Sequence, residues 1–351
     1  MEFLRLLVLP FSLLYGLVIS IRNLLFELKI LPSEQFPLKI ISVGNLSAGG
    51  TGKTPHVEYL IRLLSPETTL CTLSRGYGRK TKGFIAASEK DDALSIGDEP
   101  MQYYKKFSNI SVFVDENRRR GIKNILSNNP SIRALLLDDA FQHRYVKPGL
   151  SILLTDYHKL YYNDYLIPSG TLREPIRGAA RADIVIITKT PKVLSPFVRR
   201  KIVNDLKLKP HQKVYFSYIK YGQIHALWKA DFKFLPEKKY SHILLFAGIA
   251  NPYPLQDQLR KHCNELTTML FPDHHQYTLS DLEVIKRNFD DLYSRNKLLI
   301  TTEKDAMRLI TDELMEKAIQ MPVHYLPIEV DFHGGDKSQF DEQIRTYVNK
   351  N

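Results

Sequence analysis

The sequence contains little cysteine, with only two in 351 residues. Cys71 and Cys263 have none of the spacings that are typical of zinc ligands or redox pairs. The sequence therefore disfavours both a disulfide framework and a structural zinc site. A reducing compartment fits this cysteine usage.

The sequence also lacks internal repeats, low-complexity tracts and recognisable nucleic-acid-binding motifs. Its 44% hydrophobic and 25% charged residues are typical of a globular chain, and the length is sufficient for two domains of ordinary size. The formal net charge is +11, from 49 Lys and Arg against 38 Asp and Glu. This excess favours anionic partners, but without such a motif we expect no nucleic acid among them. No obligate protein partner is inferred.

An uncharged apolar segment, LLVLPFSLLYGLVISI, occupies residues 6–21 between Arg5 and Arg22. It is shorter than the roughly 20 residues of a full membrane span, so a tilted span and a helix lying in the interface both remain open. No small-residue cleavage site follows it, which argues against a signal peptide. We expect residues 1–30 to form a retained membrane-anchor helix. The alternative is a buried core helix, because the segment is short and contains Pro10.

The stretch VGNLSAGGTGKT, residues 43–54, predicts a strand end, a glycine-rich turn and the start of a helix. The glycines let the backbone curl around an anion, while Lys53 adds a positive charge and Thr54 a hydroxyl suited to Mg²⁺. Ser47 stands where the strict phosphate-loop pattern has glycine, and the extra lysine of related switch ATPases would fall at Ala48. The core GGTGKT is nevertheless present, so we expect ATP to bind here. The predicted cofactor-binding residues are Gly49, Gly50, Thr51, Gly52, Lys53 and Thr54.

Two acidic segments follow the glycine-rich turn. SIRALLLDDAFQHR is an apolar strand pattern that ends in Asp138 and Asp139, where a Walker B acid holds Mg²⁺ directly or through water. SIGDEPMQ places Asp98 on a loop that enters a helix. From the residues alone, Asp98 is either a helix cap or a base that accepts a proton from an attacking hydroxyl. The predicted metal ligands are Thr54, Asp138 and Asp139.

Histidines and cationic loops add further candidates. In FPDHHQY, either His274 or His275 is suited to pair with a carboxylate and tune it as a general base, while the absence of further ligands at the right spacing disfavours zinc. Cationic loops occur at LSRGYGRKTKG, DENRRRG and YLIPSGTLREP, and such loops suit phosphates or an anionic membrane surface. The candidate substrate-binding residues are Arg75, Tyr77, Arg119, Arg173 and Glu174.

Strand patterns alternate with helical patterns along most of the chain, as in ADIVIITKTPK, HILLFAGIANP and KLLITTEKDAMRL. KVYFSYIKYGQIHALW interrupts this order with two adjoining strand-like runs and no helix. The predicted fold is α/β, with two-lobed P-loop NTPase-like parallel sheet domains and an N-terminal apolar membrane helix. The expected division is a membrane-anchor helix at 1–30, a P-loop kinase domain at 31–215, a β-strand connection at 216–240 and a C-terminal α/β domain at 241–351.

Seven motifs carry a resemblance to a known family. In chain order they are GNLSAGGTGKTP, LSRGYGRK, GDEP, LDDAFQHR, IPSGTLREP, FPDHHQY and TEKDAMRL. With them the chain resembles the tetraacyldisaccharide 4'-kinase family, the lipid A 4'-kinases of Gram-negative bacteria, from the apolar helix to about residue 310. The resemblance implies transfer of the ATP γ-phosphate to the 4'-hydroxyl of a tetraacylated glucosamine disaccharide 1-phosphate, which gives lipid IVA and ADP.

The resemblance also implies roles for individual residues. The glycine-rich turn and its Lys and Thr bind phosphate and Mg²⁺, Asp138 and Asp139 serve the metal, and Asp98 is the catalytic acid-base residue, assisted by His274. The implied partners are a membrane-embedded glycolipid substrate and inner-membrane lipid. The implied location is the inner membrane, with the active site on its cytoplasmic face, where ATP is available.

Other classes of protein remain open on the residues. A membrane-associated P-loop ATPase switch would hydrolyse ATP without phosphorylating a lipid, and Ala48 argues against it. A soluble small-molecule kinase is a nearer alternative, and it would stay active without residues 1–30. A nucleic-acid-binding ATPase is suggested by charge alone.

Overall fold

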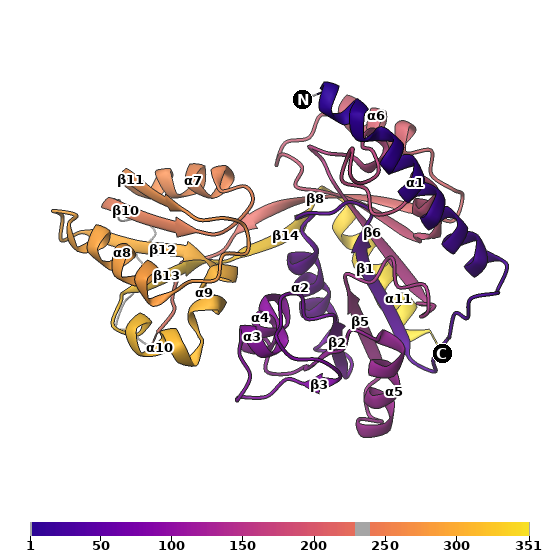
Figure 1. The fold of residues 1–351 in the computed structure, drawn as a ribbon, viewed down its shortest axis with the longest axis horizontal. Coiled ribbons are helices and arrows are strands. Elements are labelled where there is room, and N and C mark those ends of the chain that lie inside the picture. Colours follow the sequence, from indigo (N-terminus) through magenta and orange to yellow (C-terminus); the bar gives the residue numbers. More distant parts are fainter. Residues whose placement is uncertain (1, 229–238, 351) are drawn as a thin grey trace.

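The computed structural model describes residues 2–228 and 239–350. They form two α/β lobes joined by two strands, as Figure 1 shows. The part of the predicted 216–240 connection that spans 229–238 lies outside the described residues.

The first lobe is built on a nine-stranded sheet with the order β14-β8-β7-β6-β1-β5-β2-β4-β3. Its inner strands are parallel and apolar, and β5 and β7 are buried along their whole length, as expected for strands covered on both faces. The strands are β1 (Lys39–Asn45), β2 (Leu70–Ser74), β3 (Ile85–Ala86), β4 (Ser111–Val114), β5 (Ala134–Asp138), β6 (Leu150–Asp156), β7 (Ile184–Thr188), β8 (Lys213–Tyr221) and β14 (Ile328–Phe332). The helices of this lobe are α2 (Lys53–Leu64), α3 (Ala93–Ile96), α4 (Asp98–Lys106), α5 (Arg118–Asn128), α6 (Pro196–Leu206) and α11 (Asp336–Asn349), with short 3₁₀ turns at Tyr161–Asn163 and Ile176–Arg181.

The second lobe has a five-stranded sheet with the order β11-β10-β12-β13-β9. Its first four strands are parallel, and β9 pairs antiparallel at the edge. The strands are β9 (His225–Ala226), β10 (Tyr240–Ala247), β11 (Cys263–Leu270), β12 (Lys297–Thr302) and β13 (Val323–Leu326). The helices are α7 (Tyr253–Leu259), α8 (Leu279–Asp290), α9 (Glu303–Leu309) and α10 (Asp312–Ala318), with a 3₁₀ turn at Arg260–His262. The predicted α/β class with large parallel sheets is confirmed.

The end of the chain departs from the predicted division. The strand β14 pairs antiparallel with β8, and α11 packs on both of them, so residues from Ile328 onward belong to the first lobe. The physical reason is apolar burial, because Phe332, Phe340 and Ile344 complete the core of the first lobe. The chain therefore crosses between the lobes twice.

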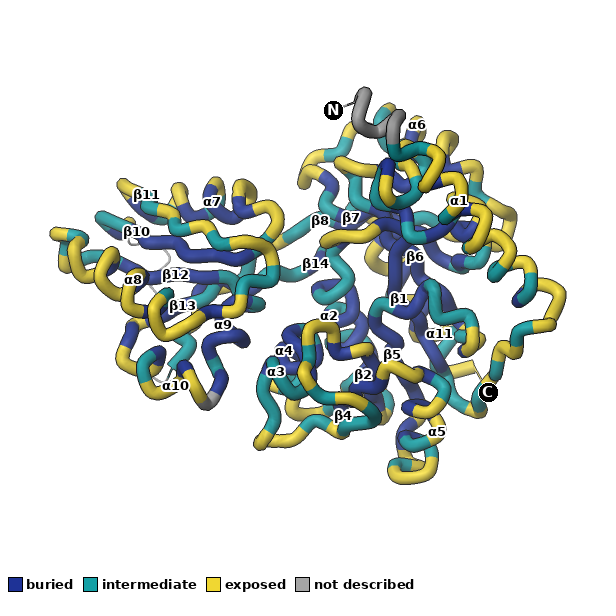
Figure 2. The backbone as a smooth tube through the Cα atoms, in the orientation of Figure 1, coloured by how far each residue is buried: buried dark blue, intermediate teal, exposed yellow. Residues whose placement is uncertain are grey.

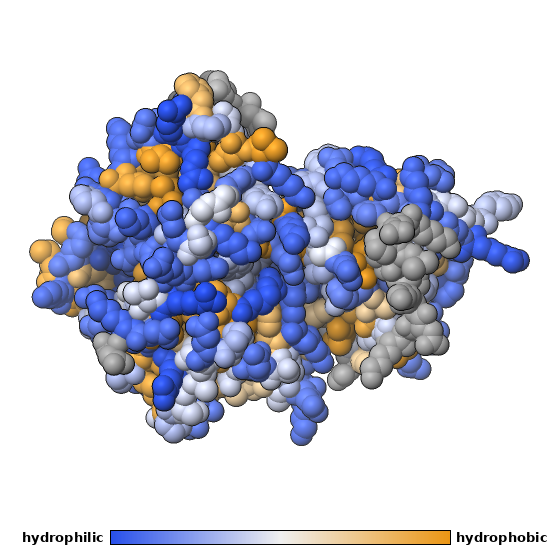
Figure 3. All heavy atoms as spheres, turned by 180° about the vertical axis from the view of Figure 1, so that it is seen from behind, coloured by the Kyte–Doolittle hydropathy of each residue, from blue (hydrophilic) through white to orange (hydrophobic). Residues whose placement is uncertain are grey.

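The N-terminal helix α1 (Glu2–Glu27) lies along the outside of the first lobe. One side is held by polar contacts: Ser12 Oγ donates to the carbonyl of Leu166 (3.0 Å), and the Tyr15 hydroxyl donates to the carbonyl of Arg173 (2.6 Å). Its other side exposes apolar residues, and Figures 2 and 3 show this exposure and the apolar surface near its N-terminal end. These residues, between 50% and 66% exposed, are Phe11, Leu13, Leu14, Leu17, Val18, Ile21 and Leu24.

The segment Val8–Glu27 is long and apolar enough to cross a membrane, judged by length and composition. Only 11% of its most apolar window is buried in the protein. The predicted apolar helix is present, and the alternative of a buried core helix does not fit this exposure.

His56 on α2 is a buried histidine that gives the fold a pH dependence. Its Nδ1 lies 2.7 Å from the carbonyl oxygen of Gly52, which can only accept, so Nδ1 carries the proton. Its Nε2 lies 3.0 Å from the Ser217 hydroxyl. Burial lowers the pKa of His56 to about 4 from an ordinary value of 6.5. The folded chain therefore holds this imidazole neutral.

We expect His56 to contribute stability that is present above pH 6.5 and lost as the pH falls toward 4. Between these values the unfolded chain binds a proton that the folded chain does not, which corresponds to about 3 kcal/mol. Urea unfolding at pH 7 and pH 4.5 measures the loss in the wild type. His56→Gln, which keeps a donor for Gly52, should show a smaller loss, and an equal loss in both proteins would contradict this assignment.

Candidate active site

The predicted site residues begin at the carboxyl ends of β1 and β5. The two strands are parallel neighbours, with Val43 opposite Asp138 in the register. The glycine-rich turn after β1 therefore reaches the same edge as the acidic pair after β5. This is the edge at which α/β sheets bind ligands.

The glycine-rich turn takes backbone conformations that favour glycine. Gly49 has φ +116° and Gly52 has φ +86°, both in the left-handed range. The helix α2 starts at Lys53, directly after Gly52 as its N-cap. Because Gly52 has no side chain to cap the helix, the first N–H groups of α2 are suited to bind an anion such as a phosphate.

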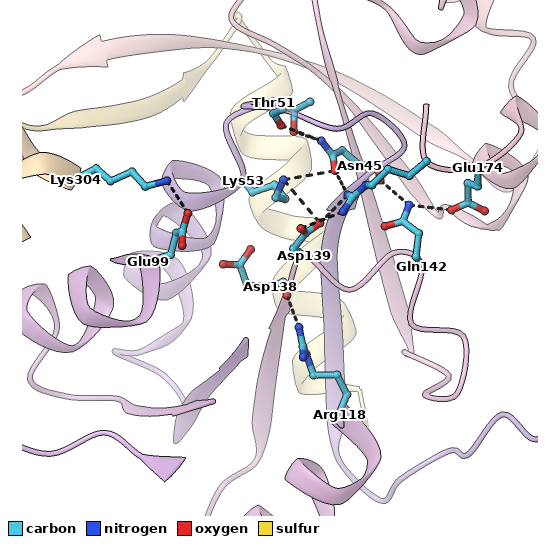
Figure 4. Close-up of polar contacts among 12 residues, drawn as sticks. Asn45, Thr51, Lys53, Glu99, Arg118, Asp138, Asp139, Gln142, Glu174 and Lys304 are labelled. Atoms are coloured by element: carbon cyan, nitrogen blue, oxygen red, sulfur yellow. Dashed lines mark hydrogen bonds and ion pairs between the residues drawn. The ribbon is translucent and has the colours of Figure 1, made fainter. Parts of the chain in front are cut away.

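Asn45, the last residue of β1, connects the parts of the site, as Figure 4 shows. Its Nδ2 donates to the Thr51 hydroxyl (2.8 Å), and its Oδ1 lies 3.5 Å from Lys53 Nζ. Gln142, four residues beyond the acidic strand, donates to the Asn45 carbonyl (2.8 Å) and to Glu174 (2.9 Å). Asn45 thus ties the turn to two other predicted motifs.

Asp139 is held by two cations. Arg173 donates to both of its oxygens, at 3.1 and 2.7 Å, and Lys53 Nζ lies 3.7 Å away. The backbone of Arg173 donates to the Leu46 carbonyl (2.7 Å), so the loop that carries it lies against the glycine-rich turn. Burial alone would raise the pKa of Asp139, but the charge of Lys53 and the contact with Arg173 lower it below its ordinary value. Asp139 is therefore ionised at neutral pH.

Asp138 is buried, and only one of its two carboxylate oxygens accepts a hydrogen bond in the described part of the chain. Its Oδ2 accepts from the Tyr103 hydroxyl (3.0 Å), while its Oδ1 has no hydrogen-bond partner within the described part of the chain. Burial, followed by the charges of Glu99 and Asp139, raises the pKa of Asp138 to about 6. A bound cation would satisfy the free oxygen and favour the ionised form.

The residues present fit Mg²⁺, which prefers a few carboxylate and hydroxyl oxygens together with nucleotide phosphates. Within residues 2–228 and 239–350, no group of three or more His, Cys, Asp or Glu side chains is arranged to hold a metal by itself.

Asp98 opens α4, and its carboxylate faces the second lobe. Gly97 is the N-cap of α4. Asp98 is therefore not a helix cap, which was one of the two roles that the sequence left open for it. Arg308 on α9 donates to Asp98 Oδ2 through Nε and Nη2, at 2.8 and 2.7 Å, and it also binds Asp305 at 2.7 Å. His274 Nδ1 lies 3.6 Å from the same Asp98 oxygen. Burial opposes ionisation, but His274 and Arg308 lower the pKa of Asp98 below its ordinary value.

Glu99 follows Asp98 in the first turn of α4. It accepts from Lys304 Nζ at 2.8 Å, and Lys304 lies 3.3 Å from His274 Nε2. Figure 4 shows Glu99 and Asp138 directed into the same space, and the charge of Glu99 contributes to the raised pKa of Asp138. The second lobe therefore supplies His274, Lys304 and Arg308 to a site whose glycine-rich turn belongs to the first lobe.

The geometry separates the two adjacent histidines. His275 Nε2 binds Asp281 at 3.0 Å, and its ring stacks on Phe271. His274 has φ +61°, faces Asp98, and lies edge-on to Tyr77 with the ring centres 5.4 Å apart. His274 is the histidine that meets the predicted base.

The remaining candidates lie at different distances from the site. Arg119 pairs with Glu34 at 2.8 Å, away from the acidic pair, whereas its buried neighbour Arg118 reaches the Asp138 carbonyl at 3.5 Å. Arg75 directly follows β2 and is exposed, and its charge contributes to the lowered pKa of Arg118, after the larger effect of burial. Glu174 binds Arg181 at 2.9 Å and faces α1 through Asn23.

Sequence reasoning missed a set of partners that only the fold brings to the site: Asn45, Glu99, Tyr103, Arg118, Lys304 and Arg308.

Comparisons with known proteins identify the family of the chain. The family described as Tetraacyldisaccharide-1-P 4'-kinase matches residues 4–349. A relative described as Tetraacyldisaccharide 4'-kinase, from Bacteroides thetaiotaomicron, is 43% identical over 97% of this chain and 93% of its own length. One from Flavobacterium johnsoniae is 45% identical over 100% of this chain and 99% of its own. A crystal structure of LpxK from Aquifex aeolicus in complex with ATP has a TM-score of 0.73 and 29% identity, and the match covers 98% of this chain and 99% of that one.

Proposed function

The chain belongs to the tetraacyldisaccharide-1-P 4'-kinase family, and from this premise we propose how its residues transfer a phosphoryl group. It is an ATP-dependent kinase of lipid A biosynthesis, as the seven sequence motifs implied. The acceptor is the 4'-hydroxyl of a tetraacylated glucosamine disaccharide 1-phosphate, and the products are lipid IVA and ADP. One observation carries the residue assignment: the glycine-rich turn and the acidic pair meet at one edge, and α4 joins them there through the contact of Tyr103 with Asp138. The same helix begins at Asp98, where the second lobe adds His274.

In this proposal the γ-phosphate lies at the N-terminus of α2, where backbone N–H groups and Lys53 stabilise its negative charge. Thr54, Asp138 and Asp139 would hold Mg²⁺, which would supply further charge neutralisation on the phosphates. Arg173, which contacts Asp139, is proposed to exchange this contact for one with a phosphate oxygen. A guanidinium binds carboxylates and phosphates with the same pair of parallel N–H donors.

Asp98 is proposed to accept the proton of the 4'-hydroxyl. Its lowered pKa keeps it ionised at neutral pH, so it is ready to act without prior deprotonation. Phosphoryl transfer passes through a loose transition state, in which a weakly basic carboxylate is sufficient as the hydroxyl loses its proton. His274 would stabilise the carboxylate before transfer and share the proton afterwards.

The glycolipid is proposed to reach this site from a membrane. Its four acyl chains hold it in the bilayer, and the exposed apolar side of α1 is suited to the same surface. Arg75, Tyr77, Arg119, Arg173 and Glu174 are the candidate contacts for its sugar and phosphate groups. We place the enzyme at the cytoplasmic face of the inner membrane, because the site requires ATP and the net charge of +11 favours an anionic leaflet.

Two aspartates on the exposed side of α1 should weaken membrane binding. Leu17→Asp/Ile21→Asp removes two apolar side chains from the interface and adds negative charge, so we expect at least about tenfold weaker binding to anionic vesicles, because each apolar residue contributes roughly 1.5–3 kcal/mol. Sedimentation with phosphatidylglycerol vesicles measures this. Tyr293→Asp, at a fully exposed aromatic of the second lobe, is the control. Unchanged binding of the double variant would contradict the role given to α1.

Release of ADP tests the kinase against the ATPase switch. The assay uses detergent micelles with Mg²⁺ and labelled ATP. A kinase is expected to form ADP only when the tetraacylated acceptor is present, and in the same amount as labelled lipid. ADP release that continues without acceptor, and without labelled lipid when the acceptor is added, would favour the switch.

A further inference from the structure

A buried cluster of charged side chains joins the two lobes beside the site. Glu58 lies on α2, Gln102 and Lys106 lie on α4, and Glu303 is the first residue of α9 in the second lobe. Glu58 is 1% exposed and Glu303 is 7% exposed. Carboxylates this deeply buried are costly unless they are paired, so the cluster has to be accounted for.

Lys106 is the cation that pairs both carboxylates. Its Nζ lies 2.8 Å from Glu58 Oε2 and 2.8 Å from Glu303 Oε1. The Gln102 amide donates to the same two residues, at 2.7 Å to Glu58 and 3.2 Å to Glu303. Arg62 adds a longer contact to Glu58 at 3.4 Å. Without Lys106, only the neutral Gln102 amide and the longer Arg62 contact would offset the facing carboxylates of the two lobes.

Each of the three helices that meet at Lys106 carries residues of the site. The helix α2 begins at Lys53 and α4 begins at Asp98. The helix α9 carries Lys304, which binds Glu99, and Arg308, which binds Asp98. Glu303 is adjacent in sequence to Lys304, so the contact that fixes the start of α9 also fixes the position of its two cations. Lys106 itself lies at the far end of α4 from Asp98.

We propose that Lys106 is a positioning residue for phosphoryl transfer, which clamps α9 of the second lobe onto α2 and α4 through Glu303 and Glu58. The clamp holds Arg308 at Asp98 in the arrangement that the transfer step needs. It also positions His274, which lies 3.3 Å from Lys304 and 3.4 Å from Arg308. Lys106 touches neither the phosphate loop nor the predicted acceptor contacts, so it acts through the relative placement of the two lobes. This inference rests on the proposed function, because it concerns the base of that reaction.

The test separates kcat from KM. Lys106→Met keeps the length of the side chain and removes its charge, and we expect kcat for lipid phosphorylation to fall by about 10- to 100-fold, because small displacements of catalytic groups cost this much. KM for ATP should change by less than about twofold, since the phosphate loop is intact. Lys106→Arg, which retains the charge, should recover most of kcat. The matched control is Lys105→Met, at the exposed neighbouring lysine of the same helix.

A double variant separates positioning from simple stability. Lys106→Met/Glu303→Gln removes Lys106 together with one of its two carboxylate partners, so thermal stability should partly recover relative to Lys106→Met. A clamp predicts that kcat stays low in this variant, because the lobes are no longer joined by an ion pair. Recovery of kcat together with stability would overturn the inference, as would full activity of Lys106→Met. The wild type in the same assay reports on the proposed function independently, because its failure to label lipid would reject that function and not the clamp alone.

Discussion

Replacing Asp98 by asparagine should lower kcat for lipid phosphorylation by about 10²- to 10⁴-fold, the range that a positioned general base contributes. Asparagine keeps the size of the side chain and can still contact Arg308, but it cannot accept a proton. The contacts of the Asp98 side chain are with Arg308 and His274 and not with the glycine-rich turn, so the affinity for ATP should change little. Initial rates of lipid labelling at saturating ATP and acceptor, together with direct ATP binding, measure both quantities.

The control for this variant is Asp290→Asn, at an exposed aspartate on α8 that pairs only with Lys286 in the described part of the chain. It should keep wild-type activity. Asp98→Asn also loses a buried ion pair with Arg308, so its melting temperature is recorded beside its activity. A folded Asp98→Asn protein with a kcat within a few-fold of the wild type would remove Asp98 from the role of base.

Replacing Lys53 by methionine should lower kcat/KM for ATP by about 10²- to 10³-fold, as expected for the loss of one cation that stabilises developing charge. Lys53 is the first residue of α2 and lies 3.7 Å from Asp139, so its ammonium group adds to the positive end of the helix at the place where phosphates would bind. Titration with a nucleotide analogue gives the dissociation constant, and lipid labelling as a function of ATP concentration gives kcat/KM.

Lys90→Met, in an exposed turn before α3, provides the matched control and should leave both constants unchanged. If Lys53→Met bound nucleotide and labelled lipid as the wild type does, the phosphates would have to bind elsewhere than the N-terminus of α2.

The features that could be predicted from the sequence are local in the chain. The glycine-rich turn, the apolar strand that ends in Asp138 and Asp139, and the apolar N-terminal helix each carry their signal within a dozen or two residues. The alternation of strand and helix patterns was sufficient for the α/β class. The parallel pairing of β1 with β5 then brings two of these signals together, as the rule for the carboxyl ends of parallel strands requires.

The features that could not be predicted depend on contacts between distant residues. Arg308 and Asp98 are 210 positions apart, and Lys106 and Glu303 are 197 apart, so no local pattern indicates that they meet. The return of β14 to the first sheet is of the same kind, because β14 continues almost directly from β13 of the second lobe. The choice between cap and base for Asp98, and between His274 and His275 as its partner, likewise required the placement of the two lobes.

The most direct test of the central claim is a ³¹P NMR spectrum of the lipid recovered after reaction of the wild-type enzyme with ATP, Mg²⁺ and the tetraacylated disaccharide 1-phosphate. The account predicts two phosphate monoester signals of equal intensity on the product, one at the original position and one at the 4'-hydroxyl, with ADP formed in the same amount. A lipid that keeps one phosphate signal while ATP is converted to ADP and inorganic phosphate would contradict it.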